Sequence, residues 1–250
     1  MARPSVRSLD QLAHGPEREE FRPLLDMPRT SGLAERAAEA IVLGVASGAL
    51  QPGQRLVEAE LAQLLKMSRV PLREALKILE AQGILESTPH RGTHIASFEN
   101  ARIDEICEVR IALERIALHG AAAAYQRNPQ DLARLDRILA AMERAARHLD
   151  WLEISKADLD FHREICAASG NTIVQTLWEA LARHVLIIFG KEIRDERDAK
   201  SIIPQHRKLR DMLAANDLKG LDAEIEHHIL RLRRRKQPPA KAKVAKRSAI

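Results

Sequence analysis

The chain has 250 residues, of which 45% are hydrophobic, 30% charged and only 3% aromatic, and its formal net charge is +5. This hydrophobic content excludes a wholly disordered chain, and the length allows one large domain or two modest ones, each with its own core. Many Ala, Leu, Ile, Arg and Glu residues with few aromatic ones favour helices packed on helices. We therefore expect a mainly α-helical chain of two domains.

The two ends of the chain differ in composition from the rest. Residues 1–29 contain four prolines and scattered charges without a hydrophobic period, so we expect a flexible N-terminal extension. Residues 236–250 are basic and rich in Pro and Ala, which is typical of a disordered tail that attracts polyanions weakly. The sequence shows no apolar signal segment and no uninterrupted apolar run of about 18 residues, so we expect a cytoplasmic protein that enters no membrane.

Residues 30–98 follow the element order of a winged helix-turn-helix domain. A helical pattern runs from Ser31 to Gly48, the turn QPGQRL follows, and EAELAQLLK predicts a second, short helix. A third helix, RVPLREALKILEAQ, follows Ser68 as its N-cap and ends at Gly83. The segments ILEST and THIASF predict two short strands, with PHRG as the bend between them. In such a domain the third helix enters the major groove of DNA and the hairpin is the wing.

The expected DNA contacts lie at the start of the third helix and at the tip of the wing. The apolar residues of that helix face the core and leave Ser68, Arg69 and Arg73 pointing outward near its N-terminal end. An arginine there can bond a guanine bidentately. Arg91 and Gly92 at the wing tip can approach the minor groove or phosphates. The alternative is a solvated basic face, in which Arg73 pairs with acidic neighbours on its own helix.

From residue 101 to residue 235 every segment has a helical pattern. Six such segments are joined by short loops, which indicates antiparallel neighbours. The fold class we expect is therefore mainly α: an N-terminal winged helix-turn-helix, with three helices and a short β-hairpin, followed by an all-α antiparallel bundle of six or seven helices.

Four polar side chains fall on the apolar faces of bundle helices. Asp158 and His162 lie on the apolar face of the helix WLEISKADLDFHREICAASGN, within about 100° of arc. His206 and His228 lie on the apolar faces of two later helices, whereas the neighbouring His227 points outward. Together they offer one carboxylate and three imidazoles to a metal ion. The alternative is four ordinary buried polar residues, although four partly satisfied polar groups in one small core are costly.

Two further side chains point inward. Arg110 lies on the inner face of the first bundle helix, where it can line a pocket or form an internal pair with Glu114. His184 lies on the inner face of a later helix and fits pocket lining or core. A metal with open coordination positions could also serve a metal-dependent hydrolase or lyase fused to the DNA-binding domain. That chemistry needs a base near the metal, and Glu114 is the main inward candidate, so we do not expect an enzyme.

The run PGQRLVEAELAQLLKMSRVPLREALKILEAQGILESTPHRGTHIA resembles the DNA-binding domain of the GntR family of bacterial transcription regulators. The typical form of that domain is PG-x-x-L-x-E-x-x-LA, then SR-x-P-x-REAL-x-x-LE-x-x-G and a wing ending in RG. The resemblance implies DNA contacts by Ser68, Arg69, Arg73, Arg91 and Gly92. Val70 stands where Thr is usual and Ala59 where some members have a contacting Arg. No operator sequence is therefore carried over to this chain.

Residues 101–235 resemble the FCD ligand-binding domain of the FadR-like branch of this family, on the motifs DLDFH, QHRKL and EHHIL. The resemblance implies a divalent ion such as zinc, nickel or manganese bound by Asp158, His162, His206 and His228. It also implies that Arg110 faces an effector pocket. We therefore expect a homodimeric transcription regulator that binds double-stranded operator DNA, and whose operator affinity is controlled by a small carboxylate effector bound at the metal.

Overall fold

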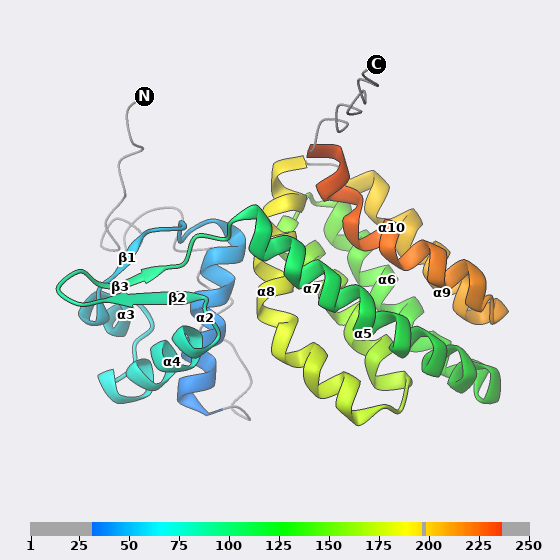
Figure 1. Ribbon diagram of the computed structural model, residues 1–250, viewed down its shortest axis with the longest axis horizontal. Coiled ribbons are helices and arrows are strands. Elements are labelled where there is room, and N and C mark those ends of the chain that lie inside the picture. Colours follow the sequence, from blue (N-terminus) through cyan, green and yellow to red (C-terminus); the bar gives the residue numbers. More distant parts are fainter. Residues whose placement is uncertain (1–31, 197–198, 237–250) are drawn as a thin grey trace, which may run out of the picture.

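The computed structural model describes residues 32–196 and 199–236 of the chain. The expected N-terminal extension, residues 1–29, and all but the first residue of the basic tail, residues 236–250, lie outside the described residues. The described chain forms a small N-terminal head followed by a helical bundle (Figure 1). This arrangement confirms the fold class, a winged helix-turn-helix followed by a bundle, and the bundle has six helices.

The head contains three helices and a small sheet. Its elements are α2 (Leu33–Ser47), β1 (Arg55–Leu56), α3 (Glu58–Leu64), α4 (Arg69–Ala81), β2 (Leu85–Thr88) and β3 (Gly92–Ile95). Strand β3 lies between the other two and is antiparallel to both. The expected hairpin is β2–β3, and β1 adds a third strand because Arg55 pairs with His94 and Leu56 with Thr93.

Helix α4 is fixed by a hydrophobic face and by its two ends. Its buried residues, which pack against α2 and the sheet side of the head, are Leu72, Ala75, Leu76 and Leu79. Gly83 follows the helix with a φ of +70°, a conformation that glycine adopts without strain. Ser68 occupies the N-cap position, but within the described chain its hydroxyl makes no capping bond. The N-terminal end of α4 is thus left exposed at the surface of the head.

The bundle helices follow one another through short loops. They are α5 (Asn100–Arg127), α6 (Leu132–Arg147), α7 (Trp151–Ala168), α8 (Thr172–Glu196), α9 (Ala199–Ala215) and α10 (Leu218–Lys236). Helix α7 packs against α5, α6 and α8, and α5 also packs against α9 and α10. The buried faces of α5, α7, α9 and α10 therefore point towards a shared interior.

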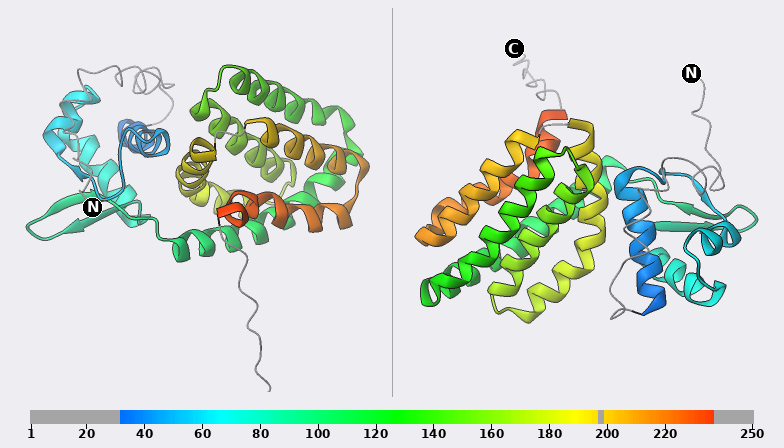
Figure 2. Two further views of the ribbon diagram at one scale, coloured as in Figure 1. Left: turned by 90° about the horizontal axis from the view of Figure 1, so that it is seen from above. Right: turned by 180° about the vertical axis from the view of Figure 1, so that it is seen from behind.

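Helix α8 joins the bundle to the head. It lies beside α2 in the views of Figures 1 and 2 and packs against α2, α5 and α7. Gly190 of α8 lies so close to α2 that a Cβ atom there would come within 2.9 Å of the main-chain oxygen of Ala46. The segment Thr172–Asp195 is long and apolar enough to cross a membrane. However, 56% of its most apolar stretch is buried in the protein, as in a core helix.

Candidate functional site

Four polar side chains from three helices meet inside the bundle. Helix α7 contributes Asp158 and His162, α9 contributes His206 and α10 contributes His228. One ligand atom from each residue lies within 4.8 Å of the others, and each residue is at most 5% exposed. The structure therefore brings together four residues that the sequence placed on the inner faces of separate helices.

The Nε2 atoms of the three imidazoles face the centre of this cluster. Nε2 of His162 lies 3.1 Å from Nε2 of His228. Nε2 of His206 lies 2.9 Å from Oδ1 of Asp158. Each of the three rings thus presents the same nitrogen to one small volume, together with a carboxylate oxygen.

Groups behind the cluster hold two of the imidazoles in place. Nδ1 of His206 lies 2.9 Å from the main-chain oxygen of Ile202, an acceptor that favours a proton on Nδ1 and metal binding through Nε2. Nδ1 of His162 lies 2.7 Å from Oε2 of Glu114. The ring of Phe161 meets that of His206 edge to face, with 4.9 Å between centroids. Such outer contacts orient metal-binding histidines in proteins.

Burial and neighbouring charges shift the pKa values of Asp158, His162 and His228. Burial alone would raise the pKa of Asp158, but the hydrogen bond and charge of His206 reverse the effect and lower that pKa below its usual range. Burial lowers the pKa of His228 well below its usual value, and cationic neighbours act in the same direction. Burial also lowers the pKa of His162, against the opposing charge of Glu114. An ionised carboxylate with neutral imidazoles is the form that binds divalent cations.

An unsatisfied polar atom supports a metal ion in the cluster. Oδ2 of Asp158 is buried and has no hydrogen-bond partner among the described residues. A buried carboxylate oxygen without a donor is costly, and a bound cation removes that cost. The cluster can therefore bind a divalent ion, and its nitrogen and oxygen donors suit zinc, nickel and manganese alike.

Arg110 lies in a buried network that reaches the cluster. Its Nε donates to Oε1 of Glu114, so the internal pair that was one of two alternatives is formed. Oε1 of Glu114 also accepts from Nε1 of Trp178 at 3.0 Å, while its Oε2 faces His162. The Arg110 guanidinium stacks over Phe189 at 4.4 Å from the ring centroid. Both Nη groups are buried without a partner among the described residues, so this cation keeps free donors for an anion.

His184 lies on the side of α8 that contacts the head. Its Nε2 is 3.0 Å from the main-chain oxygen of Gln82, the residue that ends α4, and its ring is edge-on to Phe98. Arg183 beside it donates to the Gln82 side chain at 3.1 Å and pairs with Glu35 of α2. The four-residue cluster does not include His184. The structure thus places this histidine between bundle and head.

The expected DNA contacts lie on the exposed surface of the head. Ser68 and Arg69 are exposed at the start of α4, and Arg91 and Gly92 are exposed at the hairpin bend. Gly92 has a φ of +83°, which favours glycine at that bend. Arg73 is exposed and its Nε lies 2.8 Å from a carboxylate oxygen of Glu58 on α3, rather than pairing within its own helix.

Some contacts could not be found from helical spacing. The bond of Glu114 to Trp178 and its contact with His162 join helices that are distant in sequence. Arg55 of β1 lies beside the wing, since a Cβ atom at Gly92 would come within 3.2 Å of its Nε. Its position follows from the pairing of β1 with β3, for which the two-residue segment gives no sequence signal.

Known proteins share both parts of this architecture. Residues 33–95 match the family of bacterial regulatory proteins called gntR, and residues 105–231 match the FCD domain. The chain is 30% identical over 203 residues to the probable D-xylose utilization operon transcriptional repressor of Paenarthrobacter nicotinovorans. The aligned region covers 79% of this chain and 85% of that protein. It is 29% identical over 177 residues to the HTH-type transcriptional regulator McbR of Escherichia coli, covering 69% of this chain and 78% of that protein.

The likeness extends to a solved structure. The structure of E. coli McbR/YncC superposes on this chain with a TM-score of 0.68 at 26% sequence identity, covering 83% of this chain and 100% of the other. Head and bundle thus occur together in a protein of similar length and arrangement.

Proposed function

The chain belongs to the gntR family of bacterial regulatory proteins and carries an FCD domain, and from this we propose a transcription regulator controlled by a small carboxylate bound at a metal centre. DNA binding resides in the head, and the relatives are transcriptional regulators rather than enzymes. We assign residues 30–98 to DNA binding and residues 101–235 to metal and effector binding. The observation that carries this proposal is the Asp158 cluster with the two unpartnered Nη groups of Arg110 in the same buried network.

The exposed end of α4 is proposed to read the major groove. Arg73 is held by Glu58 in an exposed ion pair, and such pairs contribute about 0–1 kcal/mol. A bidentate bond from arginine to guanine contributes about 1–3 kcal/mol of discrimination between bases. Loss of the ion pair with Glu58 therefore costs little when Arg73 turns to a base. The proposed contacts are Ser68, Arg69 and Arg73 in the groove and Arg91 and Gly92 at the wing.

We propose that two copies of the chain bind DNA together in the cytoplasm. Helix-turn-helix regulators commonly bind two half-sites about one turn of DNA apart, so the symmetry of the protein matches that of the operator. A homodimer places two α4 helices in successive major grooves. Sedimentation at the concentration that saturates operator binding tests this proposal, and a monomer under those conditions would contradict it.

In the bundle, the chain's own residues provide two kinds of attraction for a carboxylate. Asp158, His162, His206 and His228 would hold the divalent ion, which when bound supplies a positive charge with open coordination positions. Arg110 offers its buried Nη donors, and arginine stays charged at any physiological pH. Sugar acids, hydroxy acids, dicarboxylates and amino acids all fit this combination.

Helix α8 is proposed to carry the signal from bundle to head. On one side, Trp178 donates to Glu114 and Phe189 stacks on Arg110. On the head side, His184 contacts the end of α4. An anion that accepts hydrogen bonds from the Nη groups of Arg110 changes the contacts through which this network acts on α8. The coupling free energy cannot exceed the difference between the effector's binding free energies for the two states of the head.

Metal content tests the proposed function directly. We expect about one divalent ion per chain by elemental mass spectrometry in protein purified without a His-tag or chelator, and none in the Asp158→Ala, His206→Ala double variant. Retained affinity of this variant for nonspecific DNA shows that the head is intact. Wild-type protein that takes up no zinc, nickel or manganese would contradict the metal centre. Small carboxylates are then screened by thermal shift on the metal-loaded protein.

A further inference from the structure

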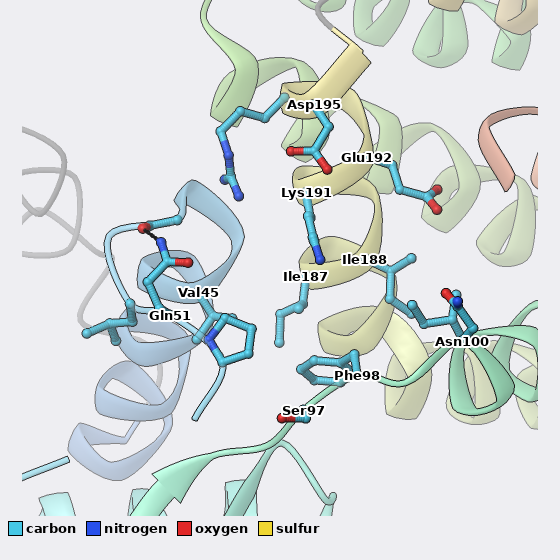
Figure 3. Close-up of a pocket in the computed structure, with 15 residues that line it drawn as sticks. Val45, Gln51, Ser97, Phe98, Asn100, Ile187, Ile188, Lys191, Glu192 and Asp195 are labelled. Carbon is cyan, nitrogen blue, oxygen red and sulfur yellow. Dashed lines mark hydrogen bonds between the residues drawn. The ribbon is translucent and has the colours of Figure 1, made fainter. Parts of the chain in front are cut away.

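A second cavity lies at the junction of head and bundle, away from the metal centre. It has a volume of about 430 Å³ and is enclosed by the end of α2 with the turn that follows, the linker from β3 to α5, and the C-terminal half of α8 (Figure 3). Neither the four residues of the metal cluster nor Arg110 lines it. Cavities of this size that bind small molecules occur preferentially at domain interfaces.

This cavity is not a consequence of loose packing between head and bundle. Beside it, Gly190 of α8 lies against Ala46 of α2 as closely as a glycine allows. Arg194 of α8 donates to the main-chain oxygen of the same Ala46 and lies over Gly48, at the C-terminal end of α2. A cation there is stabilised by the helix dipole. The two helices are thus fixed together on one side of the cavity and leave it open on the other.

The lining of the cavity is mixed, with an apolar part and several polar or charged side chains. Val45, Phe98, Ile187 and Ile188 come from the three enclosing segments, and the aliphatic residues among them are nearly inaccessible to solvent. Figure 3 shows the side chain of Lys191 extending into the space between the end of α2 and α8. Within the described chain, this ammonium group has no hydrogen bond or ion pair.

The lining also contains two acidic residues, and neither forms an ion pair with Lys191 within the described chain. Glu192 and Asp195 each interact with other groups, and Arg194 is engaged with α2. Figure 3 shows the Glu192 carboxylate turned away from Lys191. One part of the lining therefore combines aliphatic side chains and an aromatic ring with a cation that has no ion pair within the described chain. That combination complements a monoanion with an apolar body.

We propose that this hinge cavity, defined by Val45, Phe98, Ile187, Ile188 and Lys191, is a second ligand site for an aromatic monocarboxylate. The carboxylate pairs with the Lys191 ammonium and the ring lies between Phe98 and the aliphatic walls. Because head, linker and bundle each supply a wall, occupancy of the site holds these three parts in one relative position. The site is separate from the metal centre and does not depend on it.

Binding of 2-naphthoate to the full-length, metal-loaded protein tests the proposal by isothermal titration calorimetry. We expect one site per chain in the wild type. Lys191→Met keeps the aliphatic stem and removes the charge, so we expect affinity to fall by up to about fivefold, the effect of losing one partly exposed ion pair. Ser97→Trp fills the cavity from an exposed position of its lining and should abolish binding while leaving the melting temperature unchanged.

The variant His206→Ala separates this site from the metal centre. Binding of 2-naphthoate that persists in His206→Ala and weakens in Lys191→Met supports the hinge site, whether or not the metal centre binds an effector. Binding lost in His206→Ala but kept in Lys191→Met and Ser97→Trp would overturn the proposal, since the probe would then occupy the metal centre. Absence of any saturable binding to the wild type at millimolar 2-naphthoate would overturn it as well.

Discussion

His184 of α8 places its Nε2 atom 3.0 Å from the main-chain oxygen of Gln82, the residue at which α4 ends. Helix α4 is the proposed DNA-reading helix, so this hydrogen bond joins its C-terminal end to the bundle. The last carbonyls of a helix have no partner within the helix, and a side chain from elsewhere can satisfy them. Arg183 adds a second bond to the side chain of the same Gln82. A movement of α8 would therefore act on the proposed reading helix through these two hydrogen bonds.

Removal of this link should uncouple head and bundle. The quantity to compare is the ratio of the operator dissociation constants of the metal-free and the zinc-loaded protein. We expect this ratio to approach one in His184→Phe, because phenylalanine keeps a ring but cannot donate to the Gln82 oxygen. His184→Gln can still donate to the Gln82 oxygen and should retain most of the wild-type ratio. Fluorescence anisotropy with a labelled operator measures both ratios. A wild-type ratio in His184→Phe would show that the coupling bypasses this contact.

The same histidine predicts a pH dependence of stability. Burial lowers the pKa of His184, and the charges of Arg102 and Arg183 lower it further, against the hydrogen bond to Gln82. As pH falls below the ordinary histidine pKa of 6.5, the unfolded chain takes up a proton that the folded chain does not, so the folded state loses stability. We expect the wild type to lose more free energy of unfolding than His184→Gln between pH 7.5 and 5.5. Equal losses in urea titrations would argue against a buried neutral His184.

Arg73 should control operator discrimination without affecting the bundle. We expect Arg73→Ala to reduce the difference in binding free energy between operator and nonspecific DNA by about 1–3 kcal/mol. Metal content should stay at the wild-type level. Arg73→Lys keeps the charge but cannot form the bidentate bond, so discrimination should fall with a smaller loss of nonspecific affinity. Glu58→Gln removes only the partner of the exposed ion pair and should leave discrimination intact. Competition assays at a fixed salt concentration compare the variants.

The sequence predicted those features that depend on local chemistry. The boundaries of α4 follow from Ser68, Pro71 and Gly83, whose backbone preferences act within one turn of the chain. The convergence of Asp158 and His162 follows from their spacing on one helix face. His206 and His228 could be added because each lies on an apolar stripe, and an all-α bundle has one main interior for such stripes to face.

Relations between helices were not available from the sequence. Helical spacing indicates which face of α8 is apolar, but not which neighbour each side of the helix contacts. In the structure His184 contacts the head, whereas Trp178 and Phe189 contact the network of Arg110. A helix buried on two sides has two inner faces, and spacing alone does not assign each to its partner. The pairing of the third strand could not be predicted for a related reason: two residues carry no period, and β1 exists through its pairing with β3.

Glu114 should strengthen metal binding through His162. Its Oε2 lies 2.7 Å from Nδ1 of that ring, and the Arg110 guanidinium with His162 lowers the pKa of Glu114 below its usual range, although burial alone would raise it. We expect Glu114→Gln to weaken zinc affinity about 10-fold to 100-fold, because the amide keeps the shape but loses the charge that orients and polarises the imidazole. Competition with a chromophoric chelator measures the affinity. Unchanged affinity would limit Glu114 to its pair with Arg110.

Metal binding should also stabilise the folded bundle. A ligand that binds only the folded state raises the free energy of unfolding by about 4 kcal/mol at 1,000 times its dissociation constant. We expect zinc to raise the melting temperature of the wild type and to have no such effect on His228→Ala. His227→Ala is the matched control, since His227 is exposed while its neighbour His228 faces the cluster.

The outcome of this comparison depends on geometry rather than on histidine content. Both variants lose one imidazole from adjacent positions of α10, but only His227 is exposed, so nonspecific zinc binding by surface histidines would not be reduced in His228→Ala. A shift kept in His227→Ala and lost in His228→Ala therefore requires an ion held inside the bundle, with α7, α9 and α10 each supplying a ligand. Because those helices meet only in the folded state, the ion stabilises their packing directly. Equal shifts in both variants would place the zinc on the surface and remove the metal from the proposed control of DNA binding.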